Sequence, residues 1–200
     1  GWGIQHGGGT RNRIGRPSAG SQDKNTISGN SLGGLEILNA SSIETRVQNN
    51  LIGSDPSGSF AIGNSGTGIL LRGGVGGVLI GSDGDQTDDQ HEMNLISGNA
   101  GSGIRLTDVG TSGNVVAGNW IGVDISGNRP LANANDGVLL ENGASNNQIG
   151  GHTPSERNVI SGNLDDGVHL RQSETRDNIV TGNHIGTDVS GVQALPNSVN

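Results

Sequence analysis

Tandem repetition constrains this chain more than any other feature of its sequence. Copies of one phrase, Asn-x-Ile-Ser-Gly-Asn, begin at Asn25, Asn94 and Asn158, and copies of a second, Asn-x-Ile-Gly-x-Asp, begin at Asn50, Asn119 and Asn183. Both phrases shift by 69 residues from the first copy to the second and by 64 residues from the second to the third. Because two independent phrases share the same shifts, the chain is built from repeats, and the repeat decides which folds are open to it.

A shorter period runs inside this long one and divides the chain into six units. Its mark is a Gly, an aliphatic residue, any residue and a second aliphatic residue, which recurs at Gly34, Gly68, Gly103, Gly137 and Gly167, with a degraded copy at Gly1. The units are 1–33, 34–67, 68–102, 103–136, 137–166 and 167–200. They pair into three two-coil repeats, 1–67, 68–136 and 137–200, which we predict to form one domain over residues 1–200.

Each unit carries three short runs with the character of β-strands, most clearly in the fourth unit at 103–106, 114–118 and 119–123. In the first of these runs, Ile104 and Leu106 alternate with Arg105, as in a strand with one buried face. Three strands per unit, stacked unit on unit, predict an all-β solenoid with three parallel sheets and about six coils. An apolar content of 30% is too low for a wide globular core, but it suits a narrow core that a few aliphatic side chains fill in each coil.

Two details of the solenoid follow from the repeat. Along one sheet the core is predicted to be a stack of isoleucines, namely Ile27, Ile52, Ile96, Ile121, Ile160 and Ile185. The long joints are predicted to alternate between two edges. The odd units place extra residues between the second and third strands, at 15–24, 81–93 and 150–157, whereas the even units place them after the third strand, as at 125–133.

The phrases Asn-x-Ile-Ser-Gly-Asn, Gly-Ile-x-Leu and Asn-x-Ile-Gly-x-Asp resemble the right-handed parallel β-helix repeats of bacterial surface and secreted proteins, a pectin-lyase-like architecture. The resemblance covers the whole chain and implies a right-handed parallel β-helix in an extracellular or cell-surface protein. It implies no single activity, because this architecture carries polysaccharide lyases, hydrolases, epimerases, adhesins and phage tailspikes.

Charge and hydropathy exclude two classes of partner. The net charge is −8 and Lys24 is the single lysine, so we expect no binding to nucleic acid or to an anionic membrane surface. The sequence has no apolar run approaching the length of a membrane span, so no membrane insertion is expected. The first residue is Gly1 and no signal peptide is present, so the chain is expected to be a mature or excised segment.

The repeated polar residues are predicted to have structural roles. The Asn that begins each phrase falls at one joint of successive coils, where the amides are expected to hydrogen-bond to one another in a ladder along the solenoid. Asp55, Asp124 and Asp188 recur in the same way, each shortly before a Ser-Gly pair, and are expected to stabilise turns.

Segment 82–92 departs from the repeat and is strongly acidic. It contains Asp83, Asp85, Asp88 and Asp89, with His91 and Glu92 beside them. Several flexible carboxylates suit Ca²⁺, which takes six to eight oxygen ligands, although their spacing matches no complete calcium loop. A solvated acidic loop is the alternative. No cofactor is expected to be required.

A second departure lies on the first strand of adjacent units. Asp136 and Asp166 stand directly before the repeat Gly, and His169 and Arg105 are expected to point outward beside them. Paired carboxylates are what a glycosidase needs, and Asn163-Leu-Asp-Asp-Gly-Val-His distantly resembles the double-Asp stretch of polygalacturonase-type hydrolases. The Gly-His-Gly and Arg-x-Lys motifs of that family are absent, and Asp before Gly also makes a good turn. With one lysine in the chain, a Ca²⁺-dependent polysaccharide lyase is less supported still.

The third strand of each unit suggests a surface. The residue after each repeated Asn is expected to face outward, which aligns Thr26, Leu51, Leu95, Trp120, Val159 and His184 in coil order. Leu95, Trp120 and Val159 would then be the centre of an exposed apolar ribbon, the kind of surface that binds partners. The alternative is that the neighbouring loops fold over these side chains.

These observations favour a non-catalytic β-helix module of a secreted or cell-surface bacterial protein. It would serve as a rigid spacer or adhesive scaffold with weak binding of a polysaccharide or of a surface protein. The alternative is a polysaccharide-active enzyme, a hydrolase before a lyase. Aromatic residues make up only 2% of the chain, which favours the first interpretation, because sugar-processing grooves stack rings on aromatic walls. The end coils lack caps, so end-to-end self-association or a longer parent chain is also expected.

Overall fold

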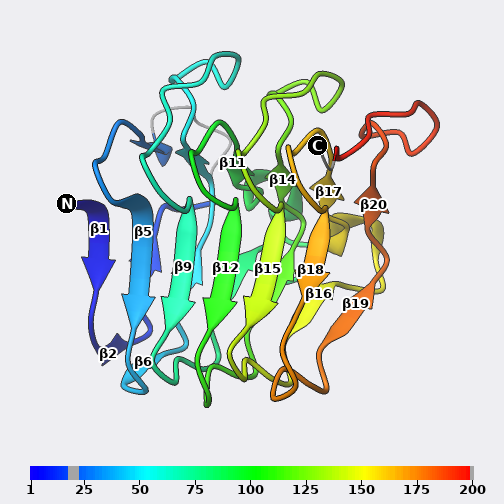
Figure 1. Ribbon diagram of the computed structural model, residues 1–200. Coiled ribbons are helices and arrows are strands. Elements are labelled where there is room, and N and C mark those ends of the chain that lie inside the picture. The colour runs from blue at the N-terminus through cyan, green and yellow to red at the C-terminus, as the bar shows by residue number, and fades with distance from the viewer. Residues whose placement is uncertain (18–22, 199–200) are drawn as a thin grey trace.

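The Gly-aliphatic-x-aliphatic runs form one parallel sheet, as the repeat predicts. A computed structural model describes residues 1–17 and 23–198. The first sheet has the strand order β1 (Trp2–His6), β5 (Gly33–Leu38), β9 (Ile69–Arg72), β12 (Ile104–Thr107), β15 (Val138–Glu141) and β18 (Val168–Leu170). Its neighbouring strands come from successive units, so five turns of the solenoid separate β1 from β18 (Figure 1).

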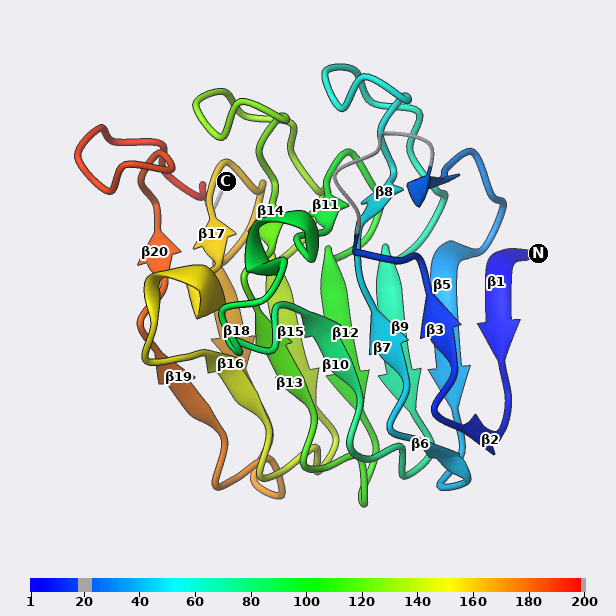
Figure 2. The same cartoon turned by 180° about the vertical axis from the view of Figure 1, so that it is seen from behind.

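The other two strands of each unit form two further parallel sheets of six strands. The second sheet contains β3 (Arg13–Ile14), β7 (Arg46–Val47), β10 (Leu79–Gly81), β13 (Val115–Ala117), β16 (Gln148–Gly150) and β19 (Ile179–Thr181). The third contains β4 (Asn25–Ile27), β8 (Asn50–Ile52), β11 (Leu95–Ile96), β14 (Trp120–Ile121), β17 (Val159–Ile160) and β20 (His184–Ile185). The first sheet runs downward in front and the second upward behind while the chain advances, which makes the solenoid right-handed (Figures 1 and 2).

A short fourth line of pairing was not predicted. β2 (Gly9–Thr10) pairs with β6 (Ser42–Ile43) in parallel, and single bridges continue the line through Gly76, Ser112 and Ser145. The described residues include two short 3-10 helices, η2 (Asp89–His91) and η3 (Pro154–Glu156). The described part of the chain contains no helix long and apolar enough to cross a membrane.

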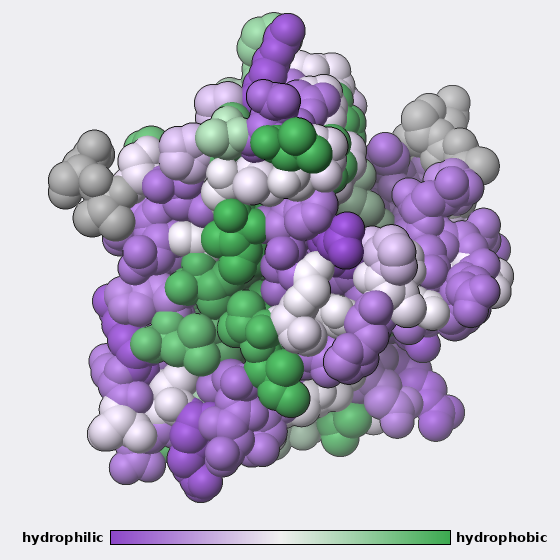
Figure 3. Space-filling model, turned by 90° about the vertical axis from the view of Figure 1, so that its right-hand side faces the viewer, coloured by the Kyte–Doolittle hydropathy of each residue, from purple (hydrophilic) through white to green (hydrophobic). Residues whose placement is uncertain are grey.

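The core is a column of aliphatic side chains from all three sheets. Five of the six isoleucines predicted along the third sheet are buried, namely Ile27, Ile52, Ile96, Ile121 and Ile160. The prediction is wrong for Ile185, which is 44% exposed, because it lies in the last coil and no further coil covers it among the described residues. Figure 3 shows apolar side chains gathered in the middle of this end of the solenoid. They include Leu170, Ile179, Val180 and Ile185.

The predicted asparagine ladder is present and runs the full length of the third sheet. The side-chain amide of each member donates to Oδ1 of the next, in the order Asn25, Asn50, Asn94, Asn119, Asn158 and Asn183. A second ladder, through Asn30, Asn64, Asn99, Asn133, Asn163 and Asn197, was not predicted. The amides also donate to backbone carbonyl groups, as from Asn50 to Ile14 at 2.8 Å. Buried polar groups are thus paired along the solenoid, which gives it rigidity.

The long joints alternate between two edges, as predicted. Those of the even units form projecting loops closed by antiparallel bridges between residues 54 and 61, 123 and 130, and 187 and 194 (Figure 1). The repeated Asp holds each loop, which confirms its turn role. At Asp55 the Ser57 hydroxyl and the backbone N–H of Phe60 donate to the carboxylate and lower its pKa to about 2. Joints 81–93 and 150–157 lie at the other edge, and part of joint 15–24 is outside the described residues.

Candidate functional site

The expected apolar ribbon on the third sheet is not open to solvent. Leu51, Leu95 and Val159 are all buried. A Cβ atom added at Gly58, in the loop that follows β8, would lie 2.9 Å from Leu95 and 2.8 Å from Ile125 of the next such loop. The even-unit loops therefore fold over the outer side of the sheet. The prediction of an exposed ribbon centred on Leu95, Trp120 and Val159 is wrong, and the alternative, loop cover, is confirmed.

Trp120 differs from its neighbours because it remains partly exposed and forms part of a pocket of about 630 Å³. Gly118 and Trp120 form its floor. One wall is the acidic joint, with Gln86, Asp88, Asp89, Gln90 and Met93, and the other is the next odd-unit joint, with Pro154, Ser155 and Arg157. We call this hollow the Trp120 pocket. Its lining joins one indole ring to carboxylates, amides and a guanidinium group.

The 150–157 wall is held by local hydrogen bonds that its sequence favours. Thr153 begins η3, Pro154 occupies its first turn, and the Glu156 carboxylate accepts bonds from the Thr153 hydroxyl at 2.8 Å and the Thr153 N–H at 2.9 Å. This is a capping box, and the Thr153 hydroxyl bond lowers the pKa of Glu156. Arg157 is held as well, because its Nε donates to the Gly182 carbonyl oxygen at 3.0 Å.

The acidic wall is anchored from below by a buried carboxylate. Glu92 accepts a bond from the Gln48 amide at 2.7 Å and one from the Asp83 N–H at 2.9 Å. Burial raises its pKa, and the charge of Asp83 adds to the effect. Both joints approach the backbone at Gly118 closely, since a Cβ atom there would lie 2.4 Å from the Ser155 carbonyl oxygen and 2.8 Å from Cβ of Ser82. Gln48 and Ser155 lie on other coils than the groups they contact, so sequence spacing did not reveal these two contacts.

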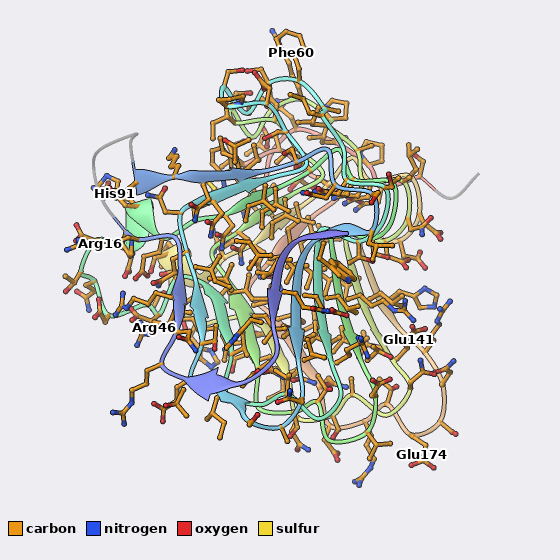
Figure 4. The ribbon with its side chains drawn as sticks, turned by 90° about the vertical axis from the view of Figure 1, so that its left-hand side faces the viewer. Arg16, Arg46, Phe60, His91, Glu141 and Glu174 are labelled. Atoms are coloured by element: carbon orange, nitrogen blue, oxygen red, sulfur yellow. The ribbon has the colours of Figure 1, made fainter. Side chains whose placement is uncertain are left out.

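The structure gathers only two of the four predicted calcium ligands. Carboxylate oxygens of Asp83, Asp89 and Glu92 lie within 4.8 Å of one another, and Asp85 and Asp88 are not in that group. Asp83 is paired with Arg46 of the second sheet, and Asp85 accepts the Thr87 N–H at 2.7 Å. Several of the carboxylate oxygens predicted to bind calcium are therefore already bound by protein groups. Figure 4 shows Arg46 and His91 on the same side of the solenoid, opposite Glu141.

The first sheet brings together three of the four candidate catalytic residues. Nδ1 of His169 lies 3.3 Å from Oδ1 of Asp136 and 3.3 Å from Oδ2 of Asp166. The Asp136 side chain is only 5% exposed, whereas His169 and Asp166 reach solvent. Burial raises the pKa of Asp136, although the charge of His169 partly opposes this effect. We call these three residues the Asp-His-Asp cluster.

Arg105 is not part of this cluster. Its Nε donates to Oε1 of Glu141 at 2.7 Å, and Nε of Arg171 donates to Oε2 of the same carboxylate at 2.6 Å. Glu141 is almost fully buried at 1% exposure. Burial raises its pKa, but the bonds from Arg171 and Arg105 outweigh burial and hold the pKa below its ordinary value. Arg105 is thus paired with Glu141. The alternation of inward and outward residues along a strand could not indicate this partner.

The fold defines the class of this chain as a parallel β-solenoid of the β-helix repeat type. Comparison of the chain with protein-family models, with curated proteins and with solved structures finds no match. The argument about function therefore rests on the Trp120 pocket and the Asp-His-Asp cluster.

Proposed function

We propose that this chain is a non-catalytic β-helix module of a secreted or cell-surface bacterial protein, a rigid scaffold that binds carbohydrate weakly in the Trp120 pocket. The observation that carries the proposal is the composition of this pocket, an indole floor between two polar walls. No cofactor is needed for this role.

The Trp120 pocket suits a sugar in size and chemistry. Its volume of about 630 Å³ falls within the roughly 300–1,000 Å³ typical of small-ligand pockets. An indole face packs against the apolar C–H face of a pyranose ring, and the ring of Trp120 supplies one. Asp88, Gln90 and Arg157 offer planar polar groups for sugar hydroxyls. Both walls are joints between strands and the floor lies on a strand, so the scaffold holds the platform in place.

Separation of the aromatic platform from the paired carboxylates argues for binding without turnover. Trp120 is in β14 of the third sheet, whereas Asp136 and Asp166 lie at the start of strands in the first sheet. The strands of the first sheet contain one aromatic residue, Trp2, which is in β1, four strands away from β15. A sugar placed on Trp120 is therefore on a different face from the paired carboxylates.

The binding experiment uses intrinsic tryptophan fluorescence during titration with neutral and acidic oligosaccharides. We expect a saturable change in emission with wild-type protein, because sugar would displace water from Trp120. The change should be retained in Trp2→Phe, which removes the other indole, and calorimetric titration, which needs no indole, should detect no binding in Trp120→Ala. Saturable binding that survives in Trp120→Ala would place the ligand elsewhere and contradict the proposed site.

The second candidate is a polysaccharide hydrolase, and the observation that favours it is the Asp-His-Asp cluster. A buried carboxyl group with a raised pKa beside a more exposed carboxylate is the arrangement of a general acid and its partner. We expect no release of reducing sugar from polygalacturonate or alginate, with or without Ca²⁺. Activity that disappears in Asp136→Asn, in protein that still melts as the wild type does, would favour the hydrolase over the binding module.

The partner proposal extends to the end of the solenoid. Strands β18, β19 and β20 form the last coil and present apolar side chains on its outer face, as Figure 3 shows. Further coils of a longer parent chain or a second copy of this chain would cover these apolar side chains in the same way, by adding a strand to each sheet. Sedimentation over a range of concentrations tests self-association directly, and a strictly monomeric particle would argue against a second copy.

A further inference from the structure

We propose that Asp136, Asp166 and His169 form a binding site for one divalent transition-metal ion of the Zn²⁺ type, which ties two neighbouring coils together. The inference is independent of the proposed carbohydrate role. It rests on where the repeat is broken, on the geometry of the three ligand atoms and on the local charge.

The repeats provide an internal control for this site. Asp136 and Asp166 stand one residue before the Gly of each first-sheet strand, where two earlier coils have Thr67 and Ser102. His169 occupies the outward row of the same sheet, in register with Leu139, where most coils have other types of residue. The other members of that row are Gln5, Glu36, Leu70 and Arg105. Two departures from the repeat, Asp136 and Asp166, thus meet His169 of this variable row at one point of the surface.

The distances are those of ligand atoms that could share one metal ion. Both contacts from Nδ1 of His169 are 3.3 Å, longer than the about 2.7–2.9 Å of a strong charge-assisted N–H···O bond, although the contact to Asp136 still meets hydrogen-bond geometry. A single Nδ1–H also cannot donate well to two carboxylates at once. Ligands about 2.0 Å from a tetrahedral Zn²⁺ lie about 3.3 Å from one another. The two carboxylate oxygens and the ring nitrogen all lie within 4.8 Å of one another.

The charge around the cluster is unbalanced without a cation. Two carboxylates, those of Asp136 and Asp166, lie 3.3 Å from the same imidazole nitrogen of His169. The Asp136 side chain is only 5% exposed, so a divalent ion would neutralise buried charge that one imidazole, shared with Asp166, balances only in part. One imidazole and two carboxylates suit Zn²⁺, while Ca²⁺ prefers six to eight oxygen ligands. Water would complete the coordination.

The ligands come from two neighbouring strands of the first sheet, which assigns the ion a structural role. Asp136 directly precedes the repeat Gly at the start of β15, Asp166 stands at the same place before β18, and His169 lies in β18. The sixth coil is the one whose core side chains remain exposed among the described residues. A metal ion bound here would hold this coil to the one before it, because a ligand that binds only the folded state stabilises that state.

The experiment is calorimetric titration of metal-free protein with Zn²⁺ alone, followed by titration with Co²⁺ as a spectroscopic probe. We expect one Zn²⁺ per chain, a rise in melting temperature on binding, and the intense visible absorption of tetrahedral Co²⁺. His169→Gln and Asp136→Asn should each weaken binding by at least about tenfold, since even indirect loss of ligand support weakens metal sites by 10-fold to 100-fold.

Asp89→Asn is the matched control, because it removes a carboxylate from the other cluster that brings acidic oxygens together. Binding in this variant should equal that of the wild type. No Zn²⁺ binding by wild-type protein, or less than a tenfold loss in His169→Gln, would overturn the proposal and leave the cluster as an ion pair. If Asp136→Asn does not fold, the partly exposed His169 decides the question by itself.

Discussion

Glu141 and Asp136 are two buried carboxylates at opposite ends of the same strand, and their surroundings push their pKa values in opposite directions. Glu141 ends β15 and receives two guanidinium groups, from Arg105 and Arg171, which lower its pKa. Asp136 precedes β15 and shares one imidazole with Asp166, so burial prevails and its pKa is raised. Both carboxylates are buried, yet one charge is balanced and the other is not, and the side chains that the neighbouring coils supply decide the difference.

The contrast separates a structural site from a candidate binding site. At Glu141 every neighbour needed to balance the charge is supplied by the chain, so nothing further is required. At Asp136 the balance is incomplete, and a residue of that kind is a candidate for function. Three predictions test this comparison, in order of decreasing effect.

Removal of both guanidinium groups that bind Glu141 should produce the largest loss of stability. Arg105→Ala combined with Arg171→Ala strands the Glu141 carboxylate without a partner. We expect a loss of about 2–3 kcal/mol in the free energy of unfolding, less than for a fully buried pair because both arginines are partly exposed. Denaturant unfolding measures the loss. Adding Glu141→Gln to the double variant should restore part of the stability, and no recovery would show that the arginines act through packing instead.

The pH dependence of unfolding should distinguish the two carboxylates by sign. The folded pKa of Glu141 lies below its ordinary value of 4.5, so its stabilising effect is present above that value and is lost as the pH falls through the folded pKa. The folded pKa of Asp136 lies above its ordinary value of 3.8, so ionisation weakens the fold as the pH rises through the folded pKa.

Thermal melts of two variants across pH 3–8 measure this difference. In metal-free protein we expect Asp136→Asn to be more stable than the wild type at pH 7 and equal to it once Asp136 is protonated in both states. Glu141→Gln should be less stable at pH 7, and its deficit should shrink in acid. Two variants that shift stability in the same direction would break the comparison.

A third buried carboxylate, Glu92, should show the smallest effect. Burial raises its pKa, but its oxygens accept hydrogen bonds from the Gln48 amide and the Asp83 N–H, so a neutral amide can replace it in part. We expect Glu92→Gln to unfold within about 1 kcal/mol of wild type. Asp85→Asn, at an exposed position of the same loop, should change nothing. A large loss in Glu92→Gln would show that this carboxylate needs its charge, as Glu141 does.

Much of the fold was predictable because the same residue types recur at the same positions of each repeat and have the same structural role in each coil. The matching shifts of two phrases predicted the solenoid, the first asparagine ladder and the turn role of Asp55 and its equivalents. The second ladder had a visible signal as well, since Asn30, Asn99 and Asn163 end one phrase. Asn64, Asn133 and Asn197 lie outside both phrases, so their partnership with these residues became evident only in three dimensions.

Less of the candidate site was predictable. Asp136, Asp166 and His169 stood out as departures from the repeat, and they do lie together. Arg105 was assigned to the wrong group because alternation shows which side of a sheet a residue faces but not which neighbour it reaches. Leu95 and Val159 were expected to be exposed because alternation does not show that loops from other coils cover the outer face.

The sequence by itself determined the class of fold, the register of the coils and the edges at which long joints emerge. These features depend on period and on residue type, and both are properties of the chain taken locally. Only the tertiary structure decided which outward side chains are covered, which carboxylate receives an arginine and where a pocket opens beside Trp120. The physical reason is that burial and charge pairing depend on residues 30 or more positions away, such as Arg105 and Glu141, which stacking brings within 2.7 Å.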